Sequence, residues 1–112
     1  MLIQIVDDSP NMREAVKAIL DGLEAEFMES SAGEEAVRQF ASRRPDVVVM
    51  DIRMEGMDGI AAARAMRNLA PDARVIIVTQ YDDSDLRAAA RNAGAYGYVP
   101  KDDLSGLRVM IS

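Results

Sequence analysis

The chain has 112 residues, a net charge of −6, and neither cysteine nor histidine. This length suits one domain with an ordinary hydrophobic core, and the missing residue types exclude disulfides, thiolate or imidazole ligands and histidine bases. The acidic balance argues against direct binding to nucleic acid, and no apolar run is long enough for membrane insertion, so we expect a cytoplasmic protein.

The first part of the chain alternates between the apolar pattern of a strand and that of a helix. Residues 2–6 are apolar except for Gln4 and predict a short buried strand. Ser9 and Pro10 then supply a side-chain cap and a first-turn proline, and they predict a helix whose apolar residues recur at helical spacing through Leu23. A weaker strand is expected over residues 25–30.

A second helix and a central strand follow. Ser31 and Glu34 have the spacing of a capping box, in which each side chain bonds the backbone amide of the other, and this predicts a helix that stops before Pro45. Residues 47–50 are an unbroken apolar run, which is typical of a parallel strand covered on both faces. The run ends at Asp51, so a carboxylate is expected at the end of this strand.

The rest of the chain continues the alternation. We expect a helix over residues 58–69, a strand over 75–79, a helix from about Ser84 that stops at Gly94, a strand over 96–99 and a short helix after Asp102. This pattern predicts one α/β domain over residues 1–112, with a doubly wound, flavodoxin-like, five-stranded parallel sheet in the order 2-1-3-4-5. The last strand would then lie at an edge, where Pro100 is tolerated because it need not donate a ladder hydrogen bond.

Polar side chains follow the predicted strands at the edge of the sheet where ligands of this architecture bind. Asp7 and Asp8 follow the first strand, Asp51 the third and Lys101 the fifth, while Thr79 ends the fourth. Crowded carboxylates repel one another unless a cation neutralises them, and oxygen-only ligands favour Mg²⁺ or Mn²⁺. Lys101 starts roughly 10 Å from Asp51, a gap that a long side chain and a phosphoryl group together can close.

Each of these residues also has an ordinary structural explanation. Asp8 beside Ser9 favours the start of a helix, Asp51 suits a loop, Thr79 suits a strand end, and Lys101 suits a solvated surface. Their joint position at the ends of four strands favours a shared reactive site over four separate coincidences.

The sequence around these residues resembles the receiver domain of two-component response regulators over nearly the whole chain. The matching segments are Ile5-Val6-Asp7-Asp8-Ser9, Val48-Val49-Met50-Asp51-Ile52-Arg53-Met54, Met57-Asp58-Gly59, Val78-Thr79 and Gly94-Ala95-Tyr96-Gly97-Tyr98-Val99-Pro100-Lys101. The resemblance implies that Asp51 is the phosphoacceptor and that Asp8 and Asp51 bind Mg²⁺ directly. It also implies that Asp7 helps to bind the metal through water, and that the backbone carbonyl of Arg53 is a further ligand.

The resemblance also implies how the phosphorylated state is held and transmitted. Thr79 and Lys101 would hold the phosphoryl oxygens, and Tyr98 would be the switch aromatic that alters the face built from the fourth helix, the last strand and the last helix. The implied partners are a sensor histidine kinase or a histidine phosphotransfer protein, and a downstream protein target. As an alternative to the downstream target, a second copy of the chain would bind the same face and form a homodimer. The only catalysis expected is that of the chain's own phosphorylation and dephosphorylation.

The chain departs from the family pattern in several places. Glu55 stands where the family often has proline, Gln80 follows Thr79 where a small residue is usual, and Pro100 precedes the lysine instead of following it. By the resemblance, Arg53 and Tyr81 flank the path of the water that would remove the phosphoryl group. Because both side chains are large, we predict slow self-dephosphorylation.

Two other functions remain open on the sequence alone. One is a Mg²⁺-dependent phosphatase or phosphotransferase with an aspartyl nucleophile, although Arg53 occupies the place of the second aspartate of haloacid-dehalogenase-type enzymes. The other is a pseudo-receiver that binds partners without accepting phosphate, although Asp51, Thr79 and Lys101 are all present.

Overall fold

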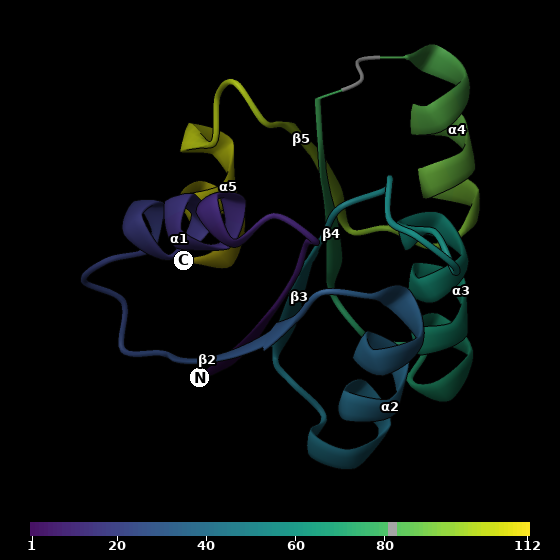
Figure 1. Ribbon diagram of the computed structural model, residues 1–112, viewed down its shortest axis with the longest axis horizontal. Coiled ribbons are helices and arrows are strands. Elements are labelled where there is room, and N and C mark those ends of the chain that lie inside the picture. Colours follow the sequence, from purple (N-terminus) through teal and green to yellow (C-terminus); the bar gives the residue numbers. More distant parts are fainter. Residues whose placement is uncertain (81–82) are drawn as a thin grey trace.

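The computed structural model describes residues 1–80 and 83–112, and strands alternate with helices along it (Figure 1). The strands are β1 (Leu2–Val6), β2 (Glu26–Ser30), β3 (Val47–Met50), β4 (Val75–Thr79) and β5 (Gly97–Pro100). The helices are α1 (Pro10–Ile19), α2 (Gly33–Arg43), α3 (Gly59–Leu69), α4 (Ser84–Asn92) and α5 (Ser105–Ile111). Within these described residues the strands form one parallel sheet in the order β2-β1-β3-β4-β5, so the predicted topology is confirmed.

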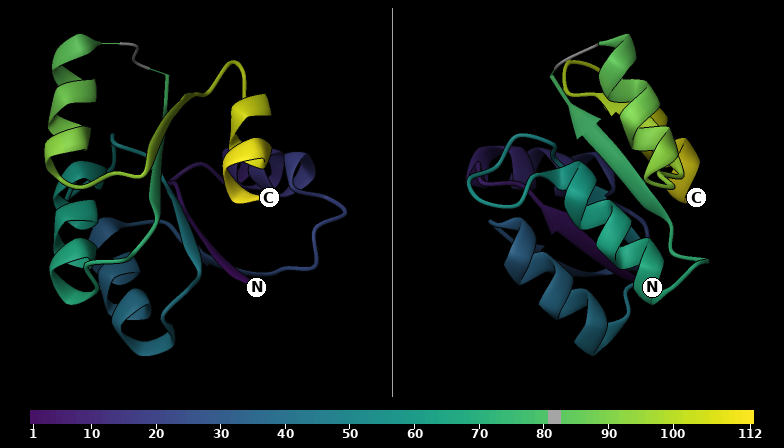
Figure 2. Two further views of the ribbon diagram at one scale, coloured as in Figure 1. Left: turned by 180° about the vertical axis from the view of Figure 1, so that it is seen from behind. Right: turned by 90° about the vertical axis from the view of Figure 1, so that its right-hand side faces the viewer.

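Helices cover both faces of the sheet (Figures 1 and 2). α1 and α5 pack on one face, and α2, α3 and α4 pack on the other. Val47 and Val49 of β3 belong to the core under α1 and α5, whereas Val48 and Met50 belong to the core under the other three helices. Both faces of β3 are therefore buried, which explains why the strand is apolar at every position.

Most helix ends follow the local signals in the sequence. The hydroxyl of Ser9 accepts a hydrogen bond from the amide of Met12 at 3.3 Å and caps α1 as predicted. α1 ends at Ile19, earlier than the apolar spacing through Leu23 indicated. Gly94 follows α4 with a φ of 92°, a conformation that glycine adopts without steric cost, and so stops the helix as predicted.

The prediction of a capping box at the start of α2 is wrong. The residue before α2 is Ala32, and it makes no side-chain cap hydrogen bond. The carboxylate of Glu34 instead accepts a hydrogen bond from the amide of Met57 at 2.7 Å, across the gap to the loop before α3. The amide of Ser31 donates to Glu35 at 3.3 Å, so a neighbouring residue takes the place predicted for Glu34.

The C-terminal elements complete the edge of the sheet. β5 begins at Gly97, one residue later than expected, and Pro100 at its end lies beside Thr79 on the edge strand, as predicted. Arg108 of α5 donates to the backbone carbonyls of Ile19 at 3.1 Å and Asp21 at 2.6 Å. These carbonyls lie at the C-terminal end of α1, where helix carbonyls lack intrahelical partners, so Arg108 ties α5 to α1.

Among residues 1–80 and 83–112, no helix is both long and apolar enough to cross a membrane.

Candidate functional site

The hydrogen-bond ladder of the sheet continues past the strand ends and holds the polar residues there. The amide of Asp51 donates to the carbonyl of the last residue of β1 at 2.9 Å, and that of Lys101 donates to the last residue of β4 at 2.9 Å. The amide of Asp7 donates to the last residue of β2 at 3.1 Å. Because the ladder fixes these backbones, the side chains project from a rigid edge.

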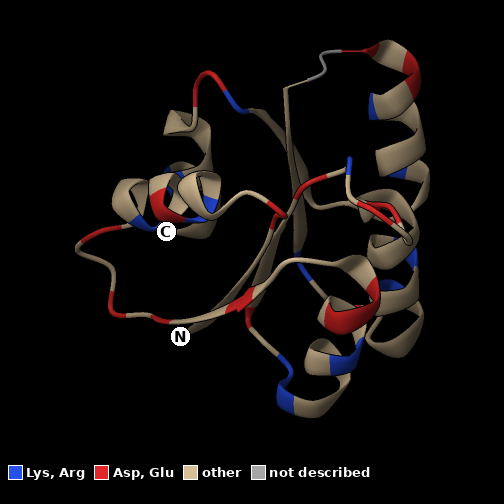
Figure 3. Ribbon diagram, in the orientation of Figure 1, with Lys and Arg blue, Asp and Glu red and all other residues tan. Residues whose placement is uncertain are grey.

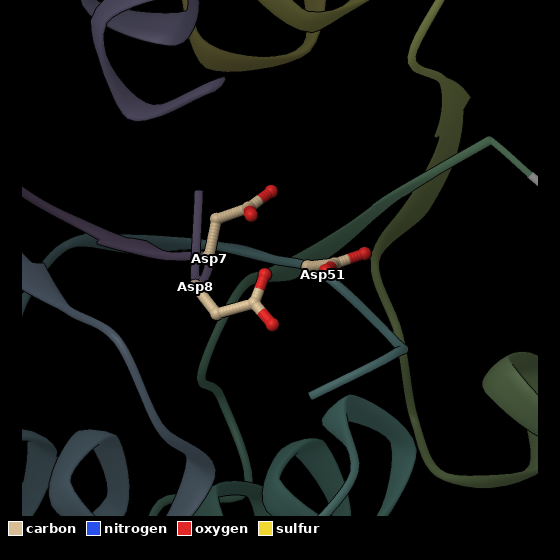
Figure 4. A group of neighbouring side chains, drawn as sticks. All are labelled: Asp7, Asp8 and Asp51. Carbon is tan, nitrogen blue, oxygen red and sulfur yellow. The ribbon is translucent and has the colours of Figure 1, made fainter. Parts of the chain in front are cut away.

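Asp7, Asp8 and Asp51 form one carboxylate cluster at this edge (Figure 4). Each offers an oxygen within 4.8 Å of those of the other two. Asp7 and Asp8 project from the end of β1, and Asp51 projects from the end of β3. Asp7 and Asp51 are buried, whereas Asp8 is exposed. The structure therefore brings together the three carboxylates that the strand pattern singled out.

Lys101 joins this cluster from the edge strand. Its Nζ atom lies 3.0 Å from Oδ2 of Asp7 and 3.3 Å from Oδ1 of Asp51. Figure 3 shows the basic segment after β5 and the acidic segments after β1 and β3 at the same end of the sheet. From the sequence, Lys101 was expected to reach Asp51 only through a phosphoryl group bound between them. Its contact with Asp7 was not expected.

The charges in the cluster shift one another's protonation. Burial, and then the charge of Asp7, raise the pKa of Asp51 above its usual range, and Lys101 only partly offsets them. Burial opposes the charge on Lys101, but Asp7 and Asp51 outweigh it and raise the pKa of the ammonium. Negative charge at Asp51 is thus incompletely compensated by the protein itself.

An open pocket of about 330 Å³ lies over the cluster. Its lining consists of Asp7, Asp8, Ser9, Met12, Asp51, Arg53, Gln80 and Lys101. Arg53 therefore lies at the site, as the resemblance implied, and so does Gln80. Tyr81, predicted to flank the water path, lies outside the described residues. The pocket has room for a small anionic group beside the carboxylates and the ammonium.

Thr79 and Tyr98 face the same side of the sheet. Thr79 is buried at the end of β4, and Tyr98 is half-buried on β5, where it pairs with Ile77. Ile77 and Thr79 alternate along β4 onto one face, and Tyr98 packs against the core on that face. The guanidinium carbon of Arg87 in α4 lies 4.5 Å from the centre of the Tyr98 ring, within range of a cation–π interaction.

One residue at the site was missed from the sequence. Arg13 in α1 donates to the backbone carbonyl of Asp7 at 2.6 Å, and its Nε lies 2.9 Å from Oε1 of Glu29 in β2. Arg13 therefore links the loop that carries Asp7 to the neighbouring strand. Periodicity places Arg13 on α1 but says nothing about the rotation of the helix, so no sequence signal identified this contact.

The donor set fits a divalent cation that prefers oxygen. The cluster supplies carboxylate oxygens, and Mg²⁺ is typically held by one or two carboxylates together with waters and phosphate oxygen. The raised pKa of Asp51 also favours a cation at this site, because a bound cation would stabilise the ionised carboxylate.

The comparisons with known proteins assign the family. Residues 3–112 match the model of the response regulator receiver domain, and the chain belongs to this family. It is 35% identical over 100 residues to the DNA-binding transcriptional regulator NtrC of Escherichia coli strain K12, covering 89% of this chain and 21% of NtrC. It is 33% identical over 112 residues to the response regulator GacA of Pseudomonas syringae, covering 97% of this chain and 51% of GacA. The chain thus spans about a fifth of NtrC and about half of GacA.

Solved structures agree with this assignment. The CheX-CheY-BeF3-Mg complex from Borrelia burgdorferi matches with a TM-score of 0.90 and 26% identity, covering 99% of this chain and 86% of that chain. A LuxR-family two-component response regulator from Aurantimonas matches with a TM-score of 0.87 and 34% identity, covering 96% and 79%. The fold, the acidic cluster and the family together define a signalling domain of phosphorelays, and its cluster fits a receiver-domain Mg²⁺ site.

Proposed function

We propose that the chain, as a single receiver domain over residues 1–112, accepts a phosphoryl group on Asp51 from a phosphohistidine of another protein. The observation that carries this proposal is the position of Asp51. Its carboxylate is buried at the edge of an open pocket, beside two other carboxylates and 3.3 Å from the ammonium of Lys101. Such a carboxylate is held in place as a nucleophile, and a fixed positive charge stands ready for the incoming phosphoryl oxygens.

The proposed transfer breaks one bond and forms one. A carboxylate oxygen of Asp51 attacks phosphorus, the phosphorus–nitrogen bond of the phosphohistidine breaks, and the electron pair returns to the imidazole of the donor. The Lys101 ammonium and the Thr79 hydroxyl then hold oxygens of the transferred group. The later hydrolysis of the aspartyl phosphate returns Asp51 to its carboxylate and releases phosphate. The domain thus catalyses only its own phosphorylation and dephosphorylation.

The metal proposed for this reaction is Mg²⁺, with Mn²⁺ as an alternative. Asp8 and Asp51 would bind it directly, Asp7 through water, and Arg53 through its backbone carbonyl. When bound, the metal neutralises the carboxylates and the phosphoryl oxygens. The contacts of Asp7 support its indirect role, because its oxygens already accept from the amide of Ser9 at 2.9 Å and from Lys101 at 3.0 Å.

The proposed partners follow from the same reaction. A sensor histidine kinase or a histidine phosphotransfer protein supplies the phosphoryl group in the cytoplasm, and a downstream protein reads the result. The proposed switch couples Thr79 to Tyr98, which lie on the same side of the sheet, and so alters the face formed by α4, β5 and α5. That face would bind the downstream protein or a second copy of the chain.

Labelling with a small phosphodonor tests the proposal. The purified protein is mixed with Mg²⁺ and acetyl phosphate, and intact-mass measurement is expected to show one added phosphoryl group. Asp51→Asn is expected to abolish the adduct, and Asp72→Asn, which changes an exposed carboxylate outside the cluster, should leave it unchanged. An unmodified parent protein, also after exposure to a phosphorylated kinase, would favour the pseudo-receiver. Repeated turnover of a phosphate ester would favour the phosphatase.

A further inference from the structure

The loop between β3 and α3 carries part of the proposed metal site. Residues 52–58 lead from Asp51 to α3 and include Arg53, whose carbonyl is a proposed ligand. The C-terminal end of the loop is fixed on the backbone: the amide of Gly59 donates to the carbonyl of Ile52 at 2.9 Å. A Cβ atom on Gly59 would lie 1.8 Å from the carbonyl oxygen of Asp51, so the loop closes tightly against the phosphoacceptor.

The tip of this loop is bound by a side chain from another element. Oε1 of Glu34, in the first turn of α2, accepts a hydrogen bond from the amide of Met57 at 2.7 Å. In Figure 1 the N-terminal end of α2 lies next to the loop that precedes α3. The contact therefore connects α2 to the segment that carries Arg53.

Glycines on both sides allow this contact. A Cβ atom on Gly33 of α2 would lie 2.5 Å from the carbonyl oxygen of Met57, so the two backbones approach more closely than any other residue permits. Gly56 in the loop has a φ of 76°, and a Cβ atom there would lie 2.7 Å from Oε1 of Glu34. The two glycines thus let the loop approach α2 closely and adopt the conformation in which the Met57 amide reaches the Glu34 carboxylate.

Glu34 contributes to this contact through its charge and its hydrogen bonds, because its side chain is exposed and adds nothing to the core. Its own amide and then that of Met57 lower the pKa of its carboxyl group. The group is therefore ionised at neutral pH, and its bond to Met57 is charge-assisted, which is the stronger class of hydrogen bond.

We propose that Glu34 is a positioning residue for the metal site: its bond to Met57 holds the loop so that the Arg53 carbonyl points to the cation. This role rests on the proposed Mg²⁺ site, and Glu34 itself is not one of the proposed ligands. A partner that orients a ligand typically changes metal affinity by about tenfold or more when it is removed. Without Glu34, the loop has to be ordered when the metal binds, and this cost weakens binding.

Three variants separate the hydrogen bond from the charge. Glu34→Ala removes both, and Glu34→Gln keeps an oxygen acceptor without the charge. Glu35→Ala is the control: it removes a carboxylate from the same helical turn that accepts from the amide of Ser31 instead of from Met57. Mg²⁺ affinity is measured by calorimetry with Mg²⁺ alone, and exchange of the Met57 amide is measured by NMR. The rate of labelling by acetyl phosphate is then measured across a range of Mg²⁺ concentrations.

The expected result is specific to Glu34. Mg²⁺ affinity should fall about tenfold in Glu34→Ala, by less in Glu34→Gln, and not measurably in Glu35→Ala. The Met57 amide should exchange faster in Glu34→Ala while core amides keep their rates, and saturating Mg²⁺ should restore the labelling rate. Equal affinity in Glu34→Ala and the parent, or equal losses in Glu34→Ala and Glu35→Ala, would overturn the inference and leave the metal site standing. A parent protein that binds no Mg²⁺ would overturn the site itself, and the inference with it.

Discussion

The Nζ atom of Lys101 lies 3.3 Å from Oδ1 of Asp51, so an ammonium that follows the edge strand β5 reaches a buried carboxylate that follows the central strand β3. The same ammonium lies 3.0 Å from Asp7. One cation therefore serves two buried carboxylates.

Lys101→Ala should destabilise the protein when Mg²⁺ is absent. Two buried carboxylates would then face each other without the ammonium, and the free energy of unfolding should fall by about 1–3 kcal/mol. Added Mg²⁺ should restore part of the loss, and labelling by acetyl phosphate should slow. Urea unfolding with and without Mg²⁺ measures the effect. Lys17→Ala is the control, because Lys17 pairs with Glu14 and Glu29 at the surface, where solvent screens ion pairs, and should change stability far less.

Asp51→Asn should stabilise the metal-free protein at neutral pH. Because burial and Asp7 raise the pKa of Asp51 in the folded state, ionisation of Asp51 opposes folding, and this penalty grows as the pH rises from the unfolded-state pKa through the folded-state pKa. The asparagine removes the charge and keeps the shape, so the free energy of unfolding should rise by an amount on the order of 1 kcal/mol.

The same substitution should lose its advantage in two conditions. Well below about pH 4 the aspartate is protonated in both states, so the stability difference that comes from its charge should vanish. In excess Mg²⁺ the parent gains stability by binding the metal and the variant gains less, so the order should reverse. A variant less stable than the parent in metal-free buffer at pH 7 would contradict the assigned electrostatics.

Asp8→Ala should weaken Mg²⁺ binding by about tenfold or more while leaving the fold intact. Asp8 is the exposed member of the cluster, so its removal creates no buried cavity and leaves the pair of Asp7 with Lys101 in place. Calorimetric titration gives the affinity, and circular dichroism with thermal unfolding checks the fold. Unchanged affinity would remove Asp8 from the ligand set.

Two glycine substitutions should have opposite effects. Gly59→Ala would place a Cβ atom 1.8 Å from the backbone oxygen of Asp51, which the side chain cannot avoid, so we expect a loss of more than about 2 kcal/mol. Gly106→Ala in α5 meets no atom within 4 Å, and replacing a helical glycine should stabilise the protein by up to about 1 kcal/mol. Thermal unfolding of both variants against the parent tests the pair. A stable Gly59→Ala protein would show that the loop tolerates displacement.

Replacing Arg53 and Tyr81 together with alanine should shorten the lifetime of the aspartyl phosphate several-fold, which corresponds to on the order of 1 kcal/mol in barrier. Arg53 lines the pocket, and Tyr81 follows Gln80, which also lines it. By the resemblance, both positions flank the path of the attacking water, which smaller side chains would open. Loss of phosphate from labelled protein, followed by intact mass, gives the lifetime, and an unchanged rate would mean that another feature sets it.

Features that lie within a single strand, such as its limits and the residue that follows it, could be predicted from the sequence. The limits of β3 follow from its unbroken apolar run, because a strand buried on both faces leaves little room for polar residues. β1 and β4 show the same pattern apart from Gln4 and Thr79, which are also buried. The convergence of Asp7, Asp51 and Lys101 follows in turn, since the carboxyl ends of parallel strands meet at one edge of the sheet.

Contacts between elements were beyond the sequence patterns. Glu34 looked like a local cap, yet its carboxylate binds Met57 in a loop that comes close only after α2 and α3 have packed on the sheet. The contact of Arg13 with Asp7 depends on the rotation of α1, and the contact of Lys101 with Asp7 depends on the twist of the sheet. Periodicity carries no information on either quantity.

The order of the strands has a consequence for a chain still being made on the ribosome. β1 emerges first but pairs with β3, and the ammonium that balances Asp7 and Asp51 arrives only with Lys101, after β5. If β1 to β4 pair before β5 has been made, β4, which is buried at every residue in the folded domain, would lie at an apolar edge open to pairing with other chains. The last strand of the sheet and the counter-charge of the carboxylate cluster therefore depend on the same segment, and Asp7 and Asp51 lack their ammonium until that segment has been made.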